Sequence, residues 1–403
     1  MADDVAGFPF VSRYQRWKHG DAERRLSTES NDLLMRILFS CESLMPQNGG
    51  PARSVSGLAS YFANAGAMVG LWAPDGSAVR TEFISASSGV CRLNGSAGHA
   101  LSQFGHPDVL IDSGIWLPHN HQLASLATRR RIVRVVSVRG MLERWALDHK
   151  RWKKRVAWWL YQRRDLRLAD GIHTTSEAEA STVMSKKFAV PVSMVPNGLK
   201  IEDPTGHTGF GEQKRRVALF VGRIYPVKGL PLLIEAWAKV RPKGWCMEII
   251  GPDESGHRVE LERQIAAAGL KNEFRFLGAL EGEEKRRRIA RAELAIQPSH
   301  TENFGLAIAE ALMNEIPVIT TRGTPWSEIA KQKCGWWTSI TVDGIARALA
   351  EATNTPRESL FEMGKRGRRL VVGNYSWDRV GRQFGVSLQW MLHGGDRPDC
   401  VRV

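Results

Sequence analysis

Two glutamates eight positions apart, Glu302 and Glu310, bracket an apolar segment that contains a glycine near its start. The segment follows a strand-like run, residues 294–298, so it is predicted to be a loop that opens a helix. A helix N-terminus offers unpaired N–H groups and the positive end of the helix dipole, which suits a phosphate. At 3.6 residues per turn, this spacing leaves the two carboxylates within roughly 80° around the axis. An ordinary surface helix can carry the same pair of glutamates, so the neighbouring residues must show whether this pair belongs to a binding site.

Those neighbours include two cations on a second predicted loop. The strand-like run 217–221 leads into Gly222, which permits a close backbone approach. Arg223 can form a bidentate fork on phosphate oxygens, and Lys228 adds a point charge. Loop cations are often merely solvated, but combined with the helix start near Phe304 they predict a clamp for a diphosphate. No Asp-x-Asp pair follows any predicted strand, which agrees with a clamp that needs no metal.

Apolar strand-like runs alternate twice with helical patterns along the chain, which predicts an α/β class with parallel sheets. Strands are predicted at 34–39, 67–72, 109–112, 132–136, 171–175, 217–221, 246–250, 274–277, 293–296 and 317–321. Helices are predicted at 54–64, 230–240, 258–268 and 377–391, and one after Ser176, a typical N-cap. Two Rossmann-like, doubly wound domains are expected to face a central cleft, with ligand bound at the carboxyl ends of the strands.

Domain boundaries are predicted from composition. We expect a polar N-terminal extension, an N-terminal domain, a Gly-rich linker, a C-terminal domain and a last helix that packs back on the N-terminal domain. Their bounds are 1–33, 34–202, 203–214, 215–375 and 376–403.

The composition excludes several classes of protein. A chain of 403 residues is long enough for two or three domains. No apolar run approaches the roughly 20 residues that span a bilayer, and the acidic N-terminus has no signal-peptide core. The five cysteines are scattered without a Cys-x-x-Cys, which argues against zinc and a disulfide framework and fits a reducing cytoplasm.

Positive charge is concentrated in residues 129–167, which hold fourteen Lys and Arg against three acids. Tryptophans 145, 152, 158 and 159 lie in the same segment, with Tyr161. Cations interleaved with tryptophans favour an anionic membrane surface, where the aromatic rings sit at the interface. RNA, single-stranded DNA, or a solvated helix whose tryptophans point inward are the alternatives.

The combination of Gly222-Arg223, Lys228-Gly229 and the 302–310 segment resembles the retaining GT-B glycosyltransferases of family 4. The resemblance extends from about residue 34 over nearly the whole chain. Further matches are Gly49-Gly50-Pro51, Pro196-Asn197-Gly198 and Gly251-Pro252. Finer matches, at residues 139–142, 145–147, 323–326 and 334–337, resemble a branch that assembles bacterial polysaccharides.

The resemblance implies a role for each matching residue. Arg223 and Lys228 would hold the donor diphosphate and the departing phosphate, Glu302 would face the donor sugar, and Glu310 would bind the ribose hydroxyls. The other implied donor-binding residues are Gly49, Gly50, Gly222, Asn303, Phe304, Gly305 and Leu306. The family further implies front-face attack with the leaving phosphate as proton acceptor, no metal, and no cofactor beyond the nucleotide-sugar co-substrate.

One stretch departs from the family. Members commonly carry a His-x-His-Gly-x-Trp pattern after the third strand of the first domain, whereas residues 111–116 here have Asp112 and Ser113 and lack both histidines. Asp112 or Ser113 are candidates to serve nearby, and His119 or His121 to reach in. Arg139 completes the possible acceptor side.

We therefore expect a metal-independent hexosyltransferase that uses a nucleotide-diphosphate sugar. Its acceptor is expected to be lipid-linked, a lipopolysaccharide or an exopolysaccharide, and the protein to be peripheral on the inner face of the cytoplasmic membrane, without a nucleic-acid partner. The alternatives are a nucleotide-sugar epimerase, a phosphorylase, or a membrane-binding protein with a decayed site.

Overall fold

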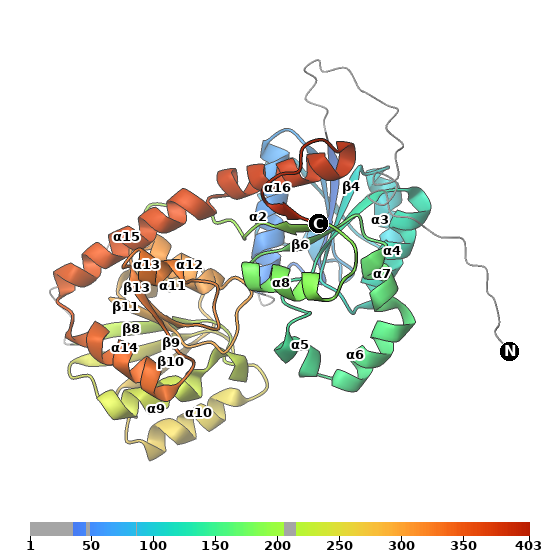
Figure 1. The fold of residues 1–403 in the computed structure, drawn as a ribbon. Coiled ribbons are helices and arrows are strands. Elements are labelled where there is room, and N and C mark those ends of the chain that lie inside the picture. Colours follow the sequence, from blue (N-terminus) through green and yellow to red (C-terminus); the bar gives the residue numbers. More distant parts are fainter. Residues whose placement is uncertain (1–34, 46–48, 86, 205–214) are drawn as a thin grey trace. The chain divides into compact units, whose positions relative to one another are not determined.

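The computed structural model describes residues 35–45, 49–85, 87–204 and 215–403. Its contacts divide the chain into two compact units (Figure 1). Unit 1 runs to Gly198 and resumes from Trp377 to Val403, and unit 2 comprises Leu199–Ser376. The predicted extension 1–33 lies outside the described residues, as does the predicted linker from residue 205 onward.

Unit 1 contains a sheet of eight described strands in the order β14-β7-β6-β5-β4-β1-β2-β3. All neighbours are parallel except β14, which runs antiparallel to β7. The strands are β1 (Arg36–Ser40), β2 (Met68–Trp72), β3 (Val90–Leu93), β4 (Val109–Ser113), β5 (Val133–Ser137), β6 (Gly171–Thr174), β7 (Val192–Met194) and β14 (Val401–Arg402).

Side chains alternate between the two faces of this sheet, and each face packs on its own helices. On one face Phe39 and Ile111 pack with α2 and α16. On the other, Leu38 and Leu110 pack with α3 and α4, and Ile172 packs with α8. The helices are α2 (Gly50–Asn64), η2 (Ser77–Val79), α3 (Ala97–Phe104), α4 (Pro118–Arg130), α5 (Arg144–Asp148), α6 (Arg151–Ala157), η3 (Trp158–Gln162), α7 (Arg163–Arg167), α8 (Glu177–Ser185) and α16 (Trp377–His393).

Unit 2 contains an all-parallel sheet of six described strands in the order β10-β9-β8-β11-β12-β13. The strands are β8 (Arg216–Val221), β9 (Trp245–Ile250), β10 (Phe274–Gly278), β11 (Leu294–Gln297), β12 (Val318–Thr321) and β13 (Gly335–Thr338). The helices are η4 (Pro226–Lys228), α9 (Leu230–Val240), α10 (His257–Ala267), α11 (Gly282–Ala290), α12 (Leu306–Met313), α13 (Glu328–Lys331), α14 (Val342–Asn354) and α15 (Arg357–Tyr375). One core joins the sheet to α9, α10 and α14, and another joins it to α12 and α15.

Both sheets reverse their direction of growth at one place. In unit 2 the chain builds β8, β9 and β10 outward and then returns to lay β11 on the other side of β8. In unit 1 the corresponding reversal lies between β1 and β4. Doubly wound sheets bind ligands at such a switch point, outside the carboxyl ends of the strands. The fold thus singles out the loops after β8 and β11, and after β1 and β4.

The last helix, α16, contributes Phe384 to the core of unit 1, and its first residue, Trp377, rests on two glycines. A Cβ at Gly57 or at Gly198 would lie 2.3 Å from the indole ring of Trp377. Glycine is required at both positions because any side chain would displace the tryptophan.

The two-domain α/β prediction is confirmed, and all ten predicted strands are present within two residues of their predicted bounds. Helix α2 begins four residues before the predicted start, at Gly50, because Pro51 is tolerated in a first turn. Strands β3, β7, β13 and β14 were not predicted. No helix in the described part of the chain is long and apolar enough to cross a membrane.

Candidate functional site

The helix predicted after Glu302 is α12, and its N-terminus is open. Gly305 is the N-cap with φ of 83°, in the left-handed region that favours glycine. No side chain caps the helix, and its first turn carries no acid. Among the described residues, the first N–H groups of α12 therefore have no capping side chain and can meet an anion.

The side chain of Phe304 belongs to the core and is only 4% exposed. Its ring packs against Trp326 and Tyr375, with centroids 5.5 and 5.4 Å away. The indole Nε1 of Trp326 donates to the Phe304 carbonyl oxygen at 2.6 Å. These contacts fix the entry to α12, so Phe304 can offer a ligand only its backbone, while Asn303 and Leu306 are half-buried beside it.

Lys228 and Glu302 form an ion pair, with Lys228 Nζ 2.6 Å from Glu302 Oε1. The hydroxyl of Ser299 donates to the same carboxylate oxygen at 2.8 Å. A backbone hydrogen bond joins the loop that holds Lys228 to the loop that holds Glu302: the His300 N–H donates to the Val227 carbonyl oxygen at 2.8 Å. The predicted clamp residue and the predicted sugar-facing residue are thus direct partners.

Glycines allow the loops at the end of β8 to pack this closely. Gly229 has φ of 69°, and a Cβ there would lie 2.1 Å from the Pro298 carbonyl oxygen. A Cβ at Gly251 would lie 1.9 Å from the carbonyl oxygen of Gly222. A side chain at Gly229 would push the Lys228 loop away from the Glu302 loop, and one at Gly251 would displace Gly222.

Arg223 follows Gly222 and is half-exposed, with Nη1 2.7 Å from Glu254 Oε2. An exposed ion pair of this kind contributes little to stability, so Arg223 can exchange its partner for a phosphate at small cost. Glu254 was not predicted to lie here. It reaches Arg223 because its own N–H donates to the Ile224 carbonyl oxygen at 3.2 Å.

Glu310 lies in α12 and has a cationic partner from α11. Lys285 Nζ is 2.8 Å from Glu310 Oε2, and the side chains are 15% and 25% exposed. Lys285 was missed in the sequence because it stands in the charged run Glu283–Arg288, where no residue differs from a solvated helix face. Each predicted glutamate is therefore paired with a lysine.

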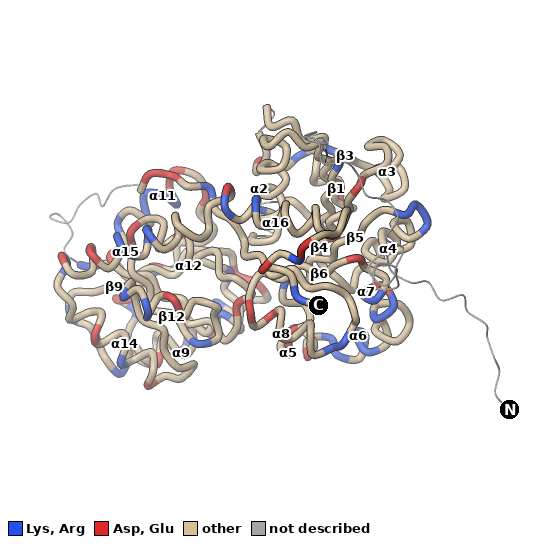
Figure 2. Tube along the Cα trace, turned by 45° about the horizontal axis from the view of Figure 1, so that its top comes forward, with Lys and Arg blue, Asp and Glu red and all other residues tan. Residues whose placement is uncertain are grey.

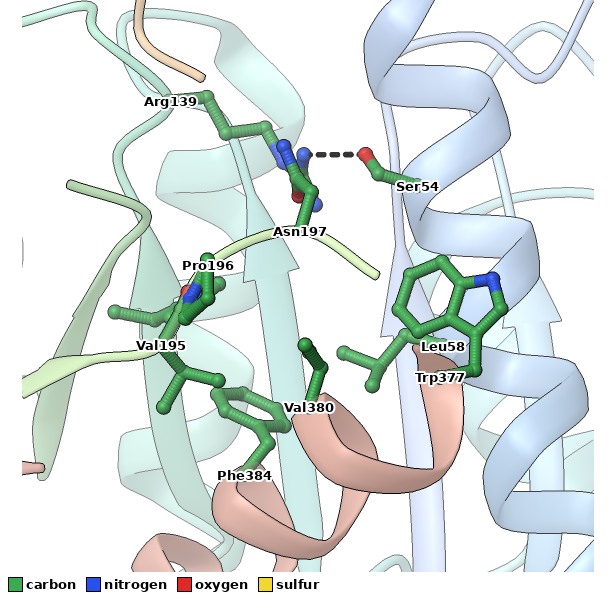
Figure 3. Close-up of a pocket in the computed structure, with 10 residues that line it drawn as sticks. Ser54, Leu58, Arg139, Val195, Pro196, Asn197, Trp377, Val380 and Phe384 are labelled. Atoms are coloured by element: carbon green, nitrogen blue, oxygen red, sulfur yellow. Dashed lines mark hydrogen bonds between the residues drawn. The ribbon is translucent and has the colours of Figure 1, made fainter. Parts of the chain in front are cut away.

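In unit 1, Gly49 is the N-cap of α2 with φ of 64°, and Gly50 is the first helical residue. Arg139, just after β5, donates from Nη1 to Ser54 Oγ at 2.7 Å. Figure 3 shows Arg139 and Ser54 at one side of a pocket that Asn197 also lines. Burial lowers the pKa of the Arg139 guanidinium, and its Nε has no partner among the described residues.

Ser113 and His119 are both buried near the switch point of this sheet, at the end of β4 and in the first turn of α4. Within the described residues, Ser113 Oγ and His119 Nε2 have no hydrogen-bond partner. Burial lowers the pKa of His119, so its imidazole is neutral at pH 7.

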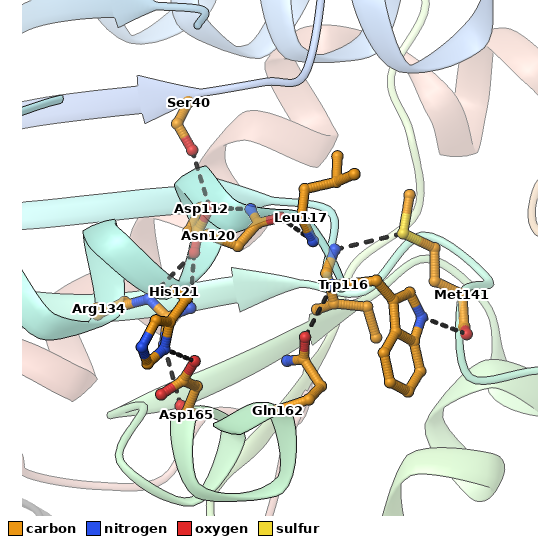
Figure 4. A network of polar contacts seen from close by, with 11 residues as sticks. Ser40, Asp112, Trp116, Leu117, Asn120, His121, Arg134, Met141, Gln162 and Asp165 are labelled. Atoms are coloured by element: carbon orange, nitrogen blue, oxygen red, sulfur yellow. Dashed lines mark hydrogen bonds and ion pairs between the residues drawn. The ribbon is translucent and has the colours of Figure 1, made fainter. Parts of the chain in front are cut away.

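Asp112 and His121 instead have structural partners (Figure 4). Asp112 is fully buried, and Arg134 donates to its Oδ2 at 2.6 Å. Ser40 Oγ and the Asn120 amide donate to its Oδ1 at 2.9 and 2.7 Å. His121 Nδ1 lies 2.7 Å from Asp165 Oδ2. Of the four candidates, Ser113 and His119 retain unsatisfied polar atoms.

The basic segment 129–167 begins in the last residues of α4, passes through β5 and then forms α5, α6, η3 and α7, with Lys and Arg along α6 and α7 (Figure 2). Trp152, Trp159 and Leu160 are 68, 75 and 73% exposed. Trp158 faces inward, its ring centroid 6.0 Å from that of Trp116. The alternative of a solvated helix whose tryptophans point inward is therefore wrong for Trp152 and Trp159.

No three His, Cys, Asp or Glu side chains gather as a possible metal site in the described ranges. The site in unit 2 consists instead of Arg223, Lys228 and the open end of α12 at the switch point of a parallel sheet. The fold and this site define an α/β protein of two Rossmann-like units with a candidate phosphate site.

Comparison with known proteins narrows this class. Residues 208–370 match the family of glycosyl transferases group 1, and residues 49–198 match a glycosyl transferase 4-like domain. The chain belongs to the group 1 glycosyltransferases with the GT-B fold.

Individual relatives are distant. The chain is 26% identical to MMP alpha-(1->4)-mannosyltransferase from Mycolicibacterium hassiacum, over 55% of this chain and 54% of that protein. It therefore spans about half the length of the curated relative. The fold is similar to sucrose-phosphate synthase from Thermosynechococcus elongatus, with a TM-score of 0.73, 16% identity, and 90% of this chain and 100% of that one covered. The fold is also similar to that of Anabaena HepE, solved with UDP and glucose. The TM-score is 0.68 and the identity 20%, with 88% of this chain and 99% of that one covered.

Proposed function

We propose that this protein is a retaining glycosyltransferase that moves a hexose from a nucleotide-diphosphate sugar to a lipid-linked, lipopolysaccharide or exopolysaccharide acceptor. The observation that carries the donor half is that Arg223, Lys228 and the open N-terminus of α12 all follow the neighbouring strands β8 and β11, at the switch point of unit 2. Three sources of positive potential there suit a diphosphate. Because Anabaena HepE was solved with UDP and glucose, UDP-glucose is the first donor to test.

The chemistry follows from where charge develops. As the anomeric C–O bond breaks, the sugar becomes oxocarbenium-like and the leaving diphosphate gains negative charge. Arg223, Lys228 and the helix dipole stabilise that anion without a metal. The acceptor oxygen bonds to the same face of the anomeric carbon and its proton passes to the leaving phosphate, so no protein base is required.

The two glutamates take different roles in this proposal. Glu302, anchored by Ser299 and Lys228, faces the donor sugar and accepts hydrogen bonds from its hydroxyls. Glu310 accepts hydrogen bonds from the ribose hydroxyls. Neither acts as an acid or a base, because the leaving phosphate takes the proton of the acceptor and each carboxylate is already paired with a lysine.

The acceptor is assigned to unit 1. Ser113 and His119 are buried polar groups with an unsatisfied atom, and a bound hydroxyl would satisfy them. A neutral His119 can accept a hydrogen bond from the attacking hydroxyl at pH 7. Arg139, beside Ser54, adds a cation for an anionic acceptor group.

We assign the segment α5–α7 to the inner face of the cytoplasmic membrane. Trp152, Trp159 and Leu160 expose apolar surface among cations, the composition that anionic headgroups favour. A lipid-linked acceptor would then be met at the surface where it resides. Nucleic acid is not proposed as a partner.

The decisive experiment is a thermal-shift screen of the purified chain against UDP-, GDP- and ADP-sugars, followed by a turnover assay with the donor that binds. A bound donor raises the unfolding temperature by mass action. Stabilisation by one donor and acceptor-dependent release of its nucleotide diphosphate would support the proposal. Donor conversion without acceptor would favour an epimerase, a requirement for free phosphate a phosphorylase, and vesicle binding without donor binding a decayed site.

A further inference from the structure

Lys285 and Glu310 form a pair that is better shielded from water than the exposed ion pairs of α11. Their side chains are 15% and 25% exposed, whereas Arg287 and Glu283, on the same helix, are 69% and 66% exposed. Exposed pairs contribute little to stability, but a carboxylate withdrawn from water costs free energy unless a charged partner compensates it. The Lys285 ammonium thus has an electrostatic role that the exposed cations of α11 lack.

The place of Glu310 explains why it needs this partner. It is the fifth residue of α12, the helix whose open N-terminus is assigned to the donor diphosphate. An uncompensated carboxylate so close to a diphosphate would repel it, since water screens charges less at a half-buried site. Lys228 compensates the charge of Glu302, which precedes the helix in the sequence, in the same way.

The pair also fixes the orientation of the carboxylate. The ammonium of Lys285 lies 2.8 Å from Oε2 of Glu310, and it comes from a separate helix, α11. A glutamate side chain has several rotamers, and one strong charge-assisted hydrogen bond selects among them. A ribose diol then meets a carboxylate that is already paired and oriented.

We propose that Lys285 is a positioning residue for ribose recognition, acting through Glu310 to keep its carboxylate charge-compensated and oriented toward the ribose hydroxyls of the donor. The inference rests on the proposed function, because it takes Glu310 to be the ribose-binding residue. It assigns Lys285 no direct part in the chemistry at the anomeric carbon.

The test measures how much more tightly the protein binds a nucleotide with ribose than the same nucleotide without the 2′ and 3′ hydroxyls. UDP, GDP and ADP are titrated by calorimetry, and the one that binds most tightly is compared with its 2′,3′-dideoxy form. Wild-type protein is expected to prefer the ribose form by about tenfold to a hundredfold, the range for hydrogen bonds to a charged group. Lys285→Met should bring that ratio close to one, and Lys285→Arg should restore most of it.

The matched control is Arg287→Met, which removes one cation from an exposed pair of the same helix. It should leave the discrimination ratio unchanged. A purely structural Lys285 would give a Lys285→Met protein with a lower melting temperature and an unchanged ratio, and that result would overturn the inference.

A double-mutant cycle with Glu310→Gln separates action through Glu310 from direct contact. If Lys285 acts through Glu310, Lys285→Met should have little further effect on the ratio in the Glu310→Gln background. Additive effects would overturn the positioning role. If wild-type protein binds none of the three nucleotides, the proposed function fails too; if it binds with discrimination that Lys285→Met preserves, only this inference fails.

Discussion

Lys228 Nζ and Glu302 Oε1 lie 2.6 Å apart, so the cation assigned to the donor diphosphate is paired with the carboxylate assigned to the donor sugar. Both side chains are mostly buried. Removing one partner leaves the other as an uncompensated charge, whereas removing both leaves none. Single and double variants of this pair can therefore separate the effect on donor binding from the effect on the stability of the fold.

Lys228→Met is expected to abolish donor turnover and to lower stability by about 2 kcal/mol, because Glu302 loses its counter-charge. The double variant Lys228→Met with Glu302→Gln should recover most of the stability and none of the turnover. Urea unfolding and a nucleotide-release assay measure the two effects. Turnover at the wild-type rate in Lys228→Met would rule out the clamp.

Arg223 is predicted to behave differently, since its partner Glu254 is exposed with it. Arg223→Ala should leave the free energy of unfolding within about 0.5 kcal/mol of wild type. It should nevertheless weaken binding of a nucleoside diphosphate by about tenfold or more, because a bidentate phosphate contact is lost. Equal affinity of the variant and wild-type protein for UDP, GDP and ADP would remove Arg223 from the site.

Gly229→Ala tests whether the two loops must touch. Gly229 and Gly256 are both helix N-caps in the left-handed region, with φ of 69° and 73°. A Cβ would clash with the Pro298 carbonyl oxygen only at Gly229, because it meets nothing within 4 Å at Gly256. Gly256→Ala should cost about 1 kcal/mol of backbone strain, and Gly229→Ala clearly more, with loss of donor binding. Equal costs would show that the loop contact is unimportant.

Much of this architecture could be predicted from the sequence, for a physical reason. Buried parallel strands such as β8 appear as unbroken apolar runs, here residues 217–221, and glycines mark turns that no other residue can make. Strand β7 is only three residues long, and β14 pairs with it from the far end of the chain, so no local pattern marks either.

The site was predictable only in part. Glu302 and Lys228 are separated by 74 positions, and their pairing depends on β11 returning beside β8. Sequence placed both at strand ends but could not give their distance. Lys285 carries no local signal at all, because its partner Glu310 lies on another helix. Likewise, the burial that separates His119 from His121 depends on tertiary packing.

The exposed tryptophans of α6 and η3 predict membrane binding that can be measured directly. Replacing Trp152 and Trp159 by Ala should weaken binding to phosphatidylglycerol vesicles by roughly tenfold for each residue, since each loses apolar area at the interface. Binding should also weaken with added salt, because the cations of the segment are screened.

A control variant is Val386→Ala, which truncates an exposed apolar side chain of α16 in the same unit. Vesicle binding should be unchanged. If Trp152→Ala and Trp159→Ala bind vesicles as wild-type protein does, the segment α5–α7 is not the membrane-facing surface.

His173 predicts a defined dependence of stability on pH. It is buried in β6, where Nε2 donates to the Val195 carbonyl oxygen at 2.8 Å and Nδ1 accepts from the Ser137 hydroxyl at 2.9 Å. These two partners fit the neutral ring, because a carbonyl only accepts. Burial lowers the pKa of His173 from 6.5 to about 4.

The direction in which stability changes with pH follows from proton uptake by the unfolded chain. In the unfolded chain His173 binds a proton as the pH falls below 6.5. In the folded chain it binds this proton only near pH 4. The stability present above pH 6.5 is therefore lost as the pH falls through this window, by roughly 3 kcal/mol in total. Urea unfolding across the window should show a shallower decline for His173→Gln than for wild-type protein, and an unaltered decline for the same change at exposed His99. Parallel curves for wild type and His173→Gln would show that His173 already accepts a proton in the folded protein.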